Sequence, residues 1–184
     1  SVTVPLVQER NRRLTCQRNL KELGTLFTAY KQEHQGKPKY DGVSMLLYVR
    51  CAKSVGKKGQ ETLFFGPGDN NMTPPTSPEQ QAKYDDVDLT NPPRDLCSYA
   101  VRDFTNYPIN VESPELEVIA CDRQGLDGRT NHHKDGIVVL FDDGSSKFMD
   151  REQLGVSTDG AIVVGPGSEH DMLKKVIYTP DRKE

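Results

Sequence analysis

The apolar positions in the first part of the chain follow helical spacing between residues 7 and 35. Those that recur at steps of three and four are Cys16, Leu20, Leu23, Phe27 and Tyr30. This spacing places them on one face of a helix, which Gly36 and Pro38 then end. The residues ahead of this face are mostly polar, so we expect the start of the helix to project from the domain or to contact another chain. That start lacks a convincing cap, which indicates the remaining half of a longer helix.

A second helix is predicted over residues 42–55, because Asp41 can cap it and its apolar residues share one side. Those residues are Met45, Leu46, Val49 and Ala52. The sequence "ETLFF" at 61–65 predicts a short strand. Residues 66–95 consist mostly of turn-forming types, so we expect a long irregular insertion on the surface.

The second half of the chain carries strand patterns rich in β-branched and aromatic residues. They are "CSYAVRDF" at 97–104, "LEVIACD" at 116–122 and "GAIVV" at 160–164. Between them, Asp143 and Gly144 form one of the strongest two-residue turn signals, so residues 136–150 are predicted to form a β-hairpin. The sheet is therefore expected within residues 96–164.

Two short helical segments are predicted after the hairpin. Asp150 and Gln153 have the spacing of a capping box, and Gly155 closes a single turn. Ser168 is placed to cap a closing helix over residues 168–178.

These elements predict one α+β domain over residues 1–184, with a long N-terminal helix over residues 1–36 packed on an antiparallel sheet. The length suits a single domain. Hydrophobic residues make up 34% of the chain, tryptophan is absent, and there are 12 prolines and 15 glycines. The core is therefore expected to be modest and the loops long.

Charge and hydropathy exclude two classes of partner for the sequence as given. The net charge is -3 and the pI is about 5.8, so nucleic acid is not an expected partner. The longest apolar runs, such as residues 137–141, are far shorter than the roughly 20 residues that a membrane-spanning helix needs. Either the protein is soluble or a membrane anchor precedes the sequence.

The cysteines contain no C-x-x-C pair that would indicate a zinc ribbon or a redox centre. They are Cys16, Cys51, Cys97 and Cys121. An even number favours disulfides in an oxidising compartment, and buried free thiols are the alternative. Their pairing is open.

The most patterned stretch is "NHHKDGIVVLFDDGSSKFMD", from Asn131 to Asp150. His132 and His133 could ligate a transition metal together with Asp142 or Asp143, because imidazole and carboxylate are suitable ligands. Adjacent side chains on a strand point to opposite faces, so His132 and His133 would need a bend to share a site. A hydrogen bond from His133 that steadies the hairpin is the simpler interpretation, and it makes the stretch architectural.

Other candidate chemistry is sparse. The aspartates of "YDDVDL", Asp85, Asp86 and Asp88, are oxygen ligands suited to calcium, but without EF-hand spacing a solvated acidic loop is the favoured interpretation. No Gly-x-Ser-x-Gly elbow, phosphate-binding loop or dinucleotide fingerprint is present. We therefore predict no catalytic residue and a protein that is not an enzyme.

The two ends of this pattern resemble the type IV pilin-like proteins, specifically the pseudopilin-like family of planctomycetes. In the first helix, the residues that match the half-helix of this family are Arg12, Arg13, Cys16, Asn19, Leu20, Lys21, Tyr30, Gly36 and Lys37. Near the end, His133 followed by nine residues and then Asp143 and Gly144 matches the His-x9-Asp-Gly signature that names the family. The family also has a Cys-Pro-x-Asp element, where this chain keeps Pro67 and Asp69 but has Gly66 in place of the cysteine.

The resemblance implies a structural, non-catalytic subunit of a type IV pilus-like or type II secretion pseudopilus assembly. Such a subunit contacts other pilin-like subunits through its N-terminal helix and the inner membrane through an apolar segment ahead of residue 1. Its domain lies in the periplasm, within the cell envelope, or in an extracellular filament. The alternative is a periplasmic module on a pilin-like scaffold that binds a ligand or a metal.

Overall fold

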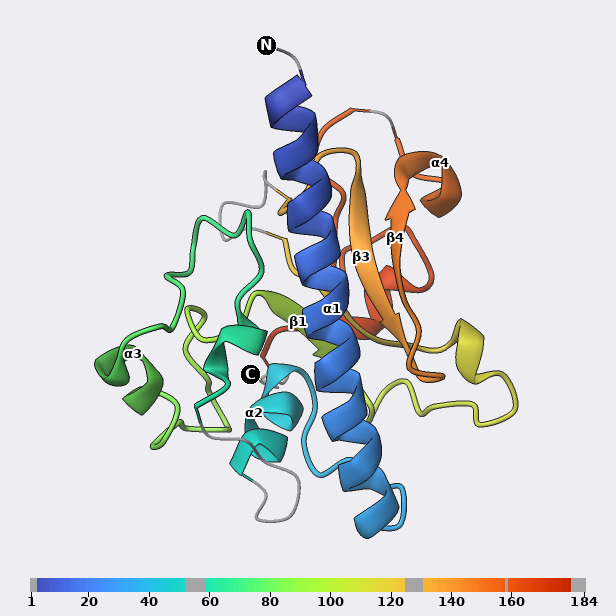
Figure 1. Cartoon of the computed structure of the whole chain (residues 1–184). Helices are drawn as coiled ribbons and strands as arrows, with labels where there is room; N and C mark the ends of the chain where they lie inside the picture. Colours follow the sequence, from blue (N-terminus) through green and yellow to red (C-terminus); the bar gives the residue numbers. More distant parts are fainter. Residues whose placement is uncertain (1–2, 52–58, 125–130, 158, 180–184) are drawn as a thin grey trace.

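The computed structural model describes residues 3–51, 59–124, 131–157 and 159–179. Helix α1, Thr3–Glu33, packs lengthwise against an antiparallel sheet of five strands (Figure 1). The predicted α+β class and the long N-terminal helix on a sheet are thereby confirmed.

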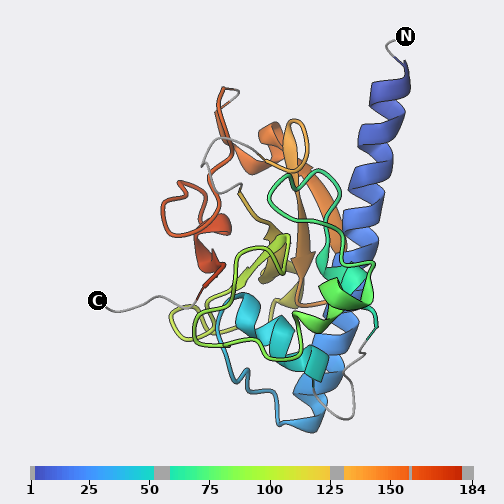
Figure 2. The same ribbon diagram turned by 90° about the vertical axis from the view of Figure 1, so that its left-hand side faces the viewer.

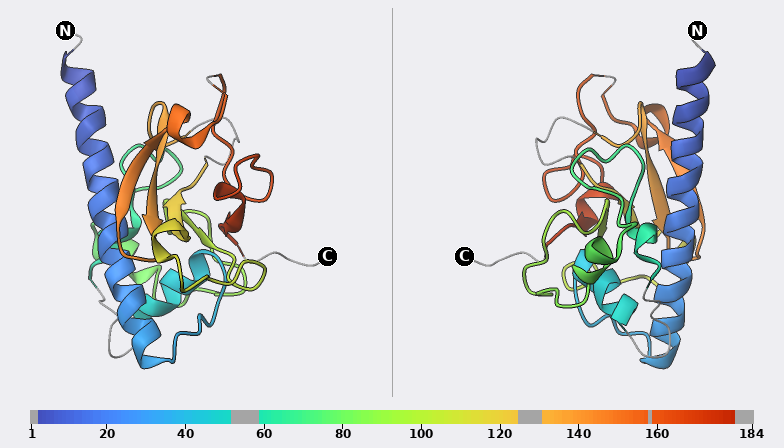
Figure 3. Two further views of the ribbon diagram at one scale, coloured as in Figure 1. Left: turned by 90° about the vertical axis from the view of Figure 1, so that its right-hand side faces the viewer. Right: turned by 60° about the vertical axis from the view of Figure 1, so that its left-hand side comes forward.

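Only the second half of α1 belongs to the core. The predicted apolar face is buried, from Cys16 to Tyr30. A Cβ at Gly24 would lie 2.9 Å from Leu140 Cδ1, so glycine permits the helix to approach the sheet closely. The first turns of α1 project past the sheet (Figures 2 and 3), and in the first half of the helix Leu6 and Leu14 are 65% and 52% exposed. No described helix is long and apolar enough to cross a membrane.

The sheet has the strand order β4-β3-β2-β1-β5, and every neighbouring pair is antiparallel. The strands are β1 Tyr99–Arg102, β2 Val118–Asp122, β3 Gly136–Phe141, β4 Ser146–Asp150 and β5 Val176–Ile177. Strands β2 and β3 are buried along their whole length, because α1 and helix α2, Val43–Cys51, cover one face. A second apolar cluster, which includes Leu154, Ile162 and Leu173, covers the other.

The predicted hairpin and its capping box are confirmed. Strands β3 and β4 pair through a turn in which Gly144 has a φ of 84° and Asp143 Oδ1 accepts hydrogen bonds from the backbone and hydroxyl of Ser145. Helix α4, Arg151–Leu154, begins at a capping box of Asp150 and Gln153. These features depend on neighbouring residues alone, which is why local sequence predicted them.

Three predicted elements are wrong. Residues 61–65 form a 3-10 helix over Glu61–Phe64 instead of a strand, because Glu61 is buried as the partner of Arg50. Residues 160–164 are irregular, since the backbone N–H groups of Ile162 and Val164 donate to the side chains of Asn131 and Gln124.

The predicted closing helix over 168–178 is the third correction. A 3-10 turn, Leu173–Lys175, leads directly into β5, where Val176 and Ile177 pair with β1. Buried β-branched residues thus complete the sheet edge in place of a helix face. The sheet consequently ends at 177 and not at 164.

The remaining predicted elements agree in outline. Helix α2 starts where predicted, and Ala52 and the rest of its predicted end lie outside the described residues. Residues 66–95 are irregular except for the short helix α3, Pro78–Ala82. This segment is not a pure surface insertion, because Asp69, Met72 and Tyr84 are buried. One further 3-10 turn, Pro114–Leu116, precedes β2.

Candidate functional site

The described part of the chain contains one group of three side chains whose ligand atoms could hold a metal ion. Cys16 on α1, Asp122 at the end of β2 and His133 just before β3 each offer an atom, and these atoms lie within 4.8 Å of one another. The exposed fractions of the three residues are 0%, 2% and 3%. The group therefore lies in the interior, between the middle of α1 and the sheet.

A bend ahead of β3 brings both histidines to the same carboxylate. His133 forms an isolated bridge with Gly136, and the turn between them contains Asp135 with a φ of 63°. His132 Nδ1 lies 3.5 Å from Asp122 Oδ1, and His133 Nε2 lies 3.4 Å from Asp122 Oδ2. The sequence predicted that the two histidines would need a bend to share a site, and this segment is bent in that way.

The far nitrogen of each imidazole faces a second carboxylate. His132 Nε2 lies 3.7 Å from Asp69 Oδ2, and His133 Nδ1 lies 3.6 Å from Glu9 Oε1. Asp69 is held by Arg123, whose Nε and Nη2 lie 3.1 and 2.8 Å from its Oδ2.

Glu9 is held in turn by two donors. Its Oε1 accepts hydrogen bonds from the backbone of Lys134 at 3.0 Å and from Arg13 Nε at 3.2 Å. The carboxylates of Asp69 and Glu9, here called the outer carboxylates, are therefore fixed in position. Each lies beside one histidine.

The centre of the group has more acceptors than donors. All four ring nitrogens and Asp122 Oδ1 are buried without a hydrogen-bonding partner among the described residues. Their closest polar contacts, 3.4–3.7 Å, exceed the usual length of an N–H···O bond. Buried polar atoms normally have a partner, and leaving one without it costs about 1–3 kcal/mol. Five such atoms in one place require an explanation.

Burial also sets the protonation of the group. It lowers the pKa of His133 below its ordinary value, although the nearby Asp122 carboxylate opposes this shift. It raises the pKa of the Cys16 thiol, and the negative charge of Asp122 adds to that effect. At neutral pH the ring of His133 is thus neutral and the thiol protonated, so Cys16 is not an activated nucleophile.

The structure does not bring the predicted signature residues together. His133 precedes β3, whereas Asp142, Asp143 and Gly144 follow it, and six strand residues span roughly 20 Å. Asp142 Oδ1 lies 2.6 Å from Lys31 Nζ. The combination of His133 with Asp142 or Asp143 as metal ligands is therefore wrong, although His133 itself belongs to a candidate site.

The three predicted calcium ligands have other contacts. Asp85 Oδ1 lies 3.1 Å from Arg50 Nη2, and Asp88 Oδ1 accepts hydrogen bonds from Thr90. Together with Asp86, they do not form a group of converging ligand atoms within the described ranges.

The described cysteines are buried free thiols. Cys16 lies on α1, Cys97 just before β1 and Cys121 on β2, and no disulfide joins them. The side chain of Cys51 lies outside the described residues. For the three described thiols, the alternative of buried free cysteines holds.

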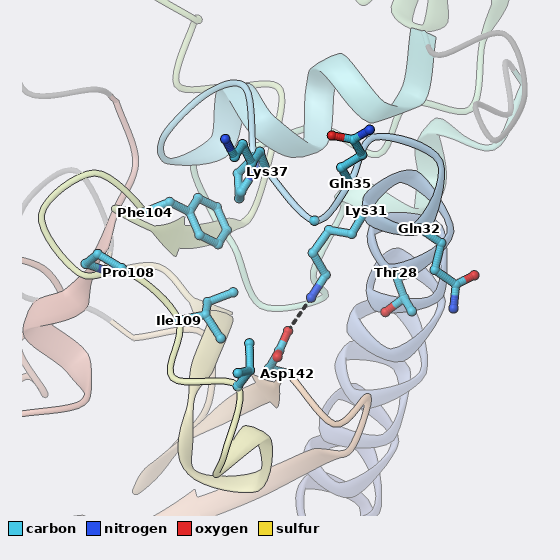
Figure 4. Close-up of a pocket in the computed structure, with 12 residues that line it drawn as sticks. Thr28, Lys31, Gln32, Gln35, Lys37, Phe104, Pro108, Ile109 and Asp142 are labelled. Atoms are coloured by element: carbon cyan, nitrogen blue, oxygen red, sulfur yellow. Dashed lines mark hydrogen bonds and ion pairs between the residues drawn. The ribbon is translucent and has the colours of Figure 1, made fainter.

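A separate hollow of about 600 Å³ lies at the C-terminal end of α1 (Figure 4). Phe104, Pro108 and Ile109 form its apolar wall, and the ion pair of Lys31 with Asp142 crosses its floor. Neither His133 nor Asp143 lines it. The hollow is open and holds no cluster of ligand atoms, so it is distinct from the buried group.

Sequence reasoning singled out His133 but missed its partners. Cys16 was assigned to the apolar face of the helix, and Asp122 to the end of a strand. No short spacing connects them, because they come from three separate elements. The chain was also compared with family models, curated proteins and solved structures, and none of them matches it. The resemblance to pilin-like proteins therefore stays a prediction.

Proposed function

We propose that the protein is a structural, non-catalytic subunit of a type IV pilus-like or type II secretion pseudopilus assembly. The observation that carries the proposal is the division of α1 into two halves. From Cys16 onward its apolar face is buried against the sheet, whereas the residues from 6 to 14 are exposed or only partly buried. A helix that extends past its own domain is suited to contact other chains.

The projecting half of α1 carries an apolar stripe. Leu6, Val7 and Leu14 are 65%, 57% and 52% exposed. Val7 and Leu14 are seven residues apart and Leu6 is adjacent, so the three lie within about 100° around the helix axis. Such a stripe favours packing against the equivalent helix of a neighbouring subunit.

The proposal places the domain in the periplasm or in an extracellular filament, with an apolar anchor ahead of α1. A periplasmic ligand-binding or metal-binding module is the second candidate function. The buried group of Cys16, Asp122 and His133 favours it, because its atoms lack partners. The two functions are compatible, since the group and the exposed stripe lie on different parts of the molecule.

The test uses the native gene and its own host. We expect it to encode about 20 consecutive apolar residues ahead of Ser1, and we expect the protein to fractionate with envelope filaments. Leu14→Arg should abolish its incorporation into those filaments while leaving the fold intact. The matched control is Leu116→Arg, because Leu116 is 68% exposed but belongs to the 3-10 turn before β2 and not to α1. An upstream sequence without an apolar segment, or equal incorporation of both variants, would contradict the proposal.

A further inference from the structure

We propose that Cys16, Asp122 and His133 bind a divalent transition metal ion of the zinc class, with His132 beside the fourth position. This inference goes beyond the assembly function and does not depend on it. The metal would join α1 to β2 and to the segment that leads into β3.

The ligand types and spacing suit such an ion. Thiolate, imidazole and carboxylate are the three side-chain ligands of zinc, whereas magnesium and calcium prefer oxygen alone. Bond lengths of about 2.0–2.1 Å to nitrogen and oxygen imply a separation of roughly 3.4 Å between two such ligands on a tetrahedron. His133 Nε2 and Asp122 Oδ2 are 3.4 Å apart. The pair is therefore already spaced for coordination.

The arrangement of hydrogen-bond donors indicates a cation at the centre. A neutral imidazole has one N–H and one lone pair. Asp69 and Glu9 face the outer nitrogens at 3.7 and 3.6 Å, and Asp122 faces the inner nitrogens at 3.5 and 3.4 Å. Each ring therefore lies between two carboxylates, although a neutral imidazole has only one N–H to offer them. A metal ion at the centre would bind the inner nitrogen of His133 and the Asp122 carboxylate directly, which leaves the N–H of that ring to the outer carboxylate.

The outer carboxylates are in the positions that metal sites commonly use. A metal-bound histidine usually donates its other N–H to a carboxylate, which fixes the tautomer and the ring orientation. Asp69 Oδ2 lies 3.7 Å from the outer nitrogen of His132, and Glu9 Oε1 lies 3.6 Å from that of His133, so both carboxylates stand beside the rings at slightly more than hydrogen-bonding distance. Arg123 and the backbone of Lys134 hold these carboxylates in place.

Gly66 keeps the space beside the thiol open. A Cβ at this position would lie 3.3 Å from Cys16 Sγ and 3.4 Å from His132 Nδ1. A side chain at this position would therefore crowd both atoms, as well as Ser98 Cβ at 3.1 Å. The absence of a side chain at residue 66 allows His132 to approach the fourth position.

The experiment uses the whole 184-residue chain after treatment with a chelator. Zn²⁺ binding is measured by calorimetry and Co²⁺ binding by absorbance. We expect one ion per chain, the visible bands of four-coordinate cobalt and a near-ultraviolet band from thiolate to cobalt. Cys16→Ser should remove the thiolate band and weaken zinc binding by at least 100-fold. Glu9→Gln should weaken it about 10–100-fold, the usual effect of losing the partner of a ligating histidine, because Glu9 faces His133.

Two control variants are matched by residue type. Cys121→Ser removes a fully buried thiol from the other face of the sheet, and His34→Gln removes an exposed histidine. Both should bind zinc as the parent chain does. The cobalt spectrum of the parent chain keeps the test decisive even where a variant fails to fold. Absence of stoichiometric zinc binding, a cobalt spectrum without a thiolate band, or equal losses in the control variants would overturn the proposal.

Discussion

Two buried polar groups lie at the ends of neighbouring strands, and their hydrogen bonding differs. Arg102 ends β1 and is 1% exposed. Its guanidinium donates to the carbonyl groups of Tyr107, Val118 and Pro108 at 2.6, 2.9 and 3.1 Å, and it also pairs with Glu117. Asp122 ends β2, but its Oδ1 and both adjacent histidines lack partners among the described residues.

The difference separates a structural polar group from a candidate binding group. A buried charge is tolerated when the protein supplies all its partners, and Arg102 meets that condition. The histidine group is equally buried, but its ring nitrogens and Asp122 Oδ1 have no hydrogen-bonding partner among the described residues. Mutation should therefore lower the stability of the fold strongly at Arg102 and little at His133. Changes of pH or of metal concentration should act through the histidine group.

The largest expected effect is the loss of Arg102. Arg102→Met should lower the free energy of unfolding by about 3–5 kcal/mol, because it leaves the partly buried carboxylate of Glu117 and three carbonyl groups without their donor. Urea denaturation in the presence of a chelator measures this. Arg10→Met, at an exposed position of α1, is the control and should change stability by no more than about 0.5 kcal/mol. A similar small loss for both variants would mean that the Arg102 network is not structural.

Acidification should weaken the fold through His133. Burial lowers the pKa of this group below its ordinary value of 6.5, so the unfolded chain binds more protons between that value and the folded pKa. Stability is therefore complete above the unfolded pKa and is lost as pH falls through the folded pKa. His132 and Arg13 reinforce this shift, whereas Asp122 and Glu9 oppose it.

The measurement is the urea midpoint of the chelated protein between about pH 8 and about pH 5. His133→Leu should flatten the acid side of the profile. An unchanged slope in this variant would show that other groups cause the loss.

The smallest expected effect is that of His133→Leu itself at neutral pH without metal. Removing a ring whose nitrogens have no partners should change the free energy of unfolding by less than about 1 kcal/mol, in contrast to Arg102→Met. Addition of Zn²⁺ should then stabilise the parent chain but not this variant. A loss comparable to that of Arg102→Met would show that the ring nitrogens are satisfied and would remove the contrast.

The parts of the fold that local sequence could predict are those in which neighbouring residues determine the structure. The buried face of α1 follows from helical spacing, and the β3–β4 hairpin from Asp143 and Gly144. The capping box of Asp150 and Gln153 is equally local. The wrong predictions have nonlocal causes. Glu61 is buried by Arg50, and residues 160–164 bond to the side chains of Asn131 and Gln124.

The candidate site could be predicted from the sequence only in part. His133 stood out in the sequence, yet its predicted partners were Asp142 and Asp143, which lie at the other end of β3. Its actual neighbours, Asp122 and Cys16, become visible only when β2 pairs with β3 and α1 crosses the sheet. An apolar periodicity that includes Cys16 explains its burial but carries no information about ligands.

The glycine at position 66 determines which kind of link can join Cys16 of α1 to its surroundings. A cysteine at this position would place its Cβ 3.3 Å from Cys16 Sγ, where oxidation could link the loop covalently to α1. With glycine there, the thiol has no such partner, and the proposed link at this place is coordination. The strength of the attachment between helix and sheet would then follow the local supply of metal and not the local supply of oxidant.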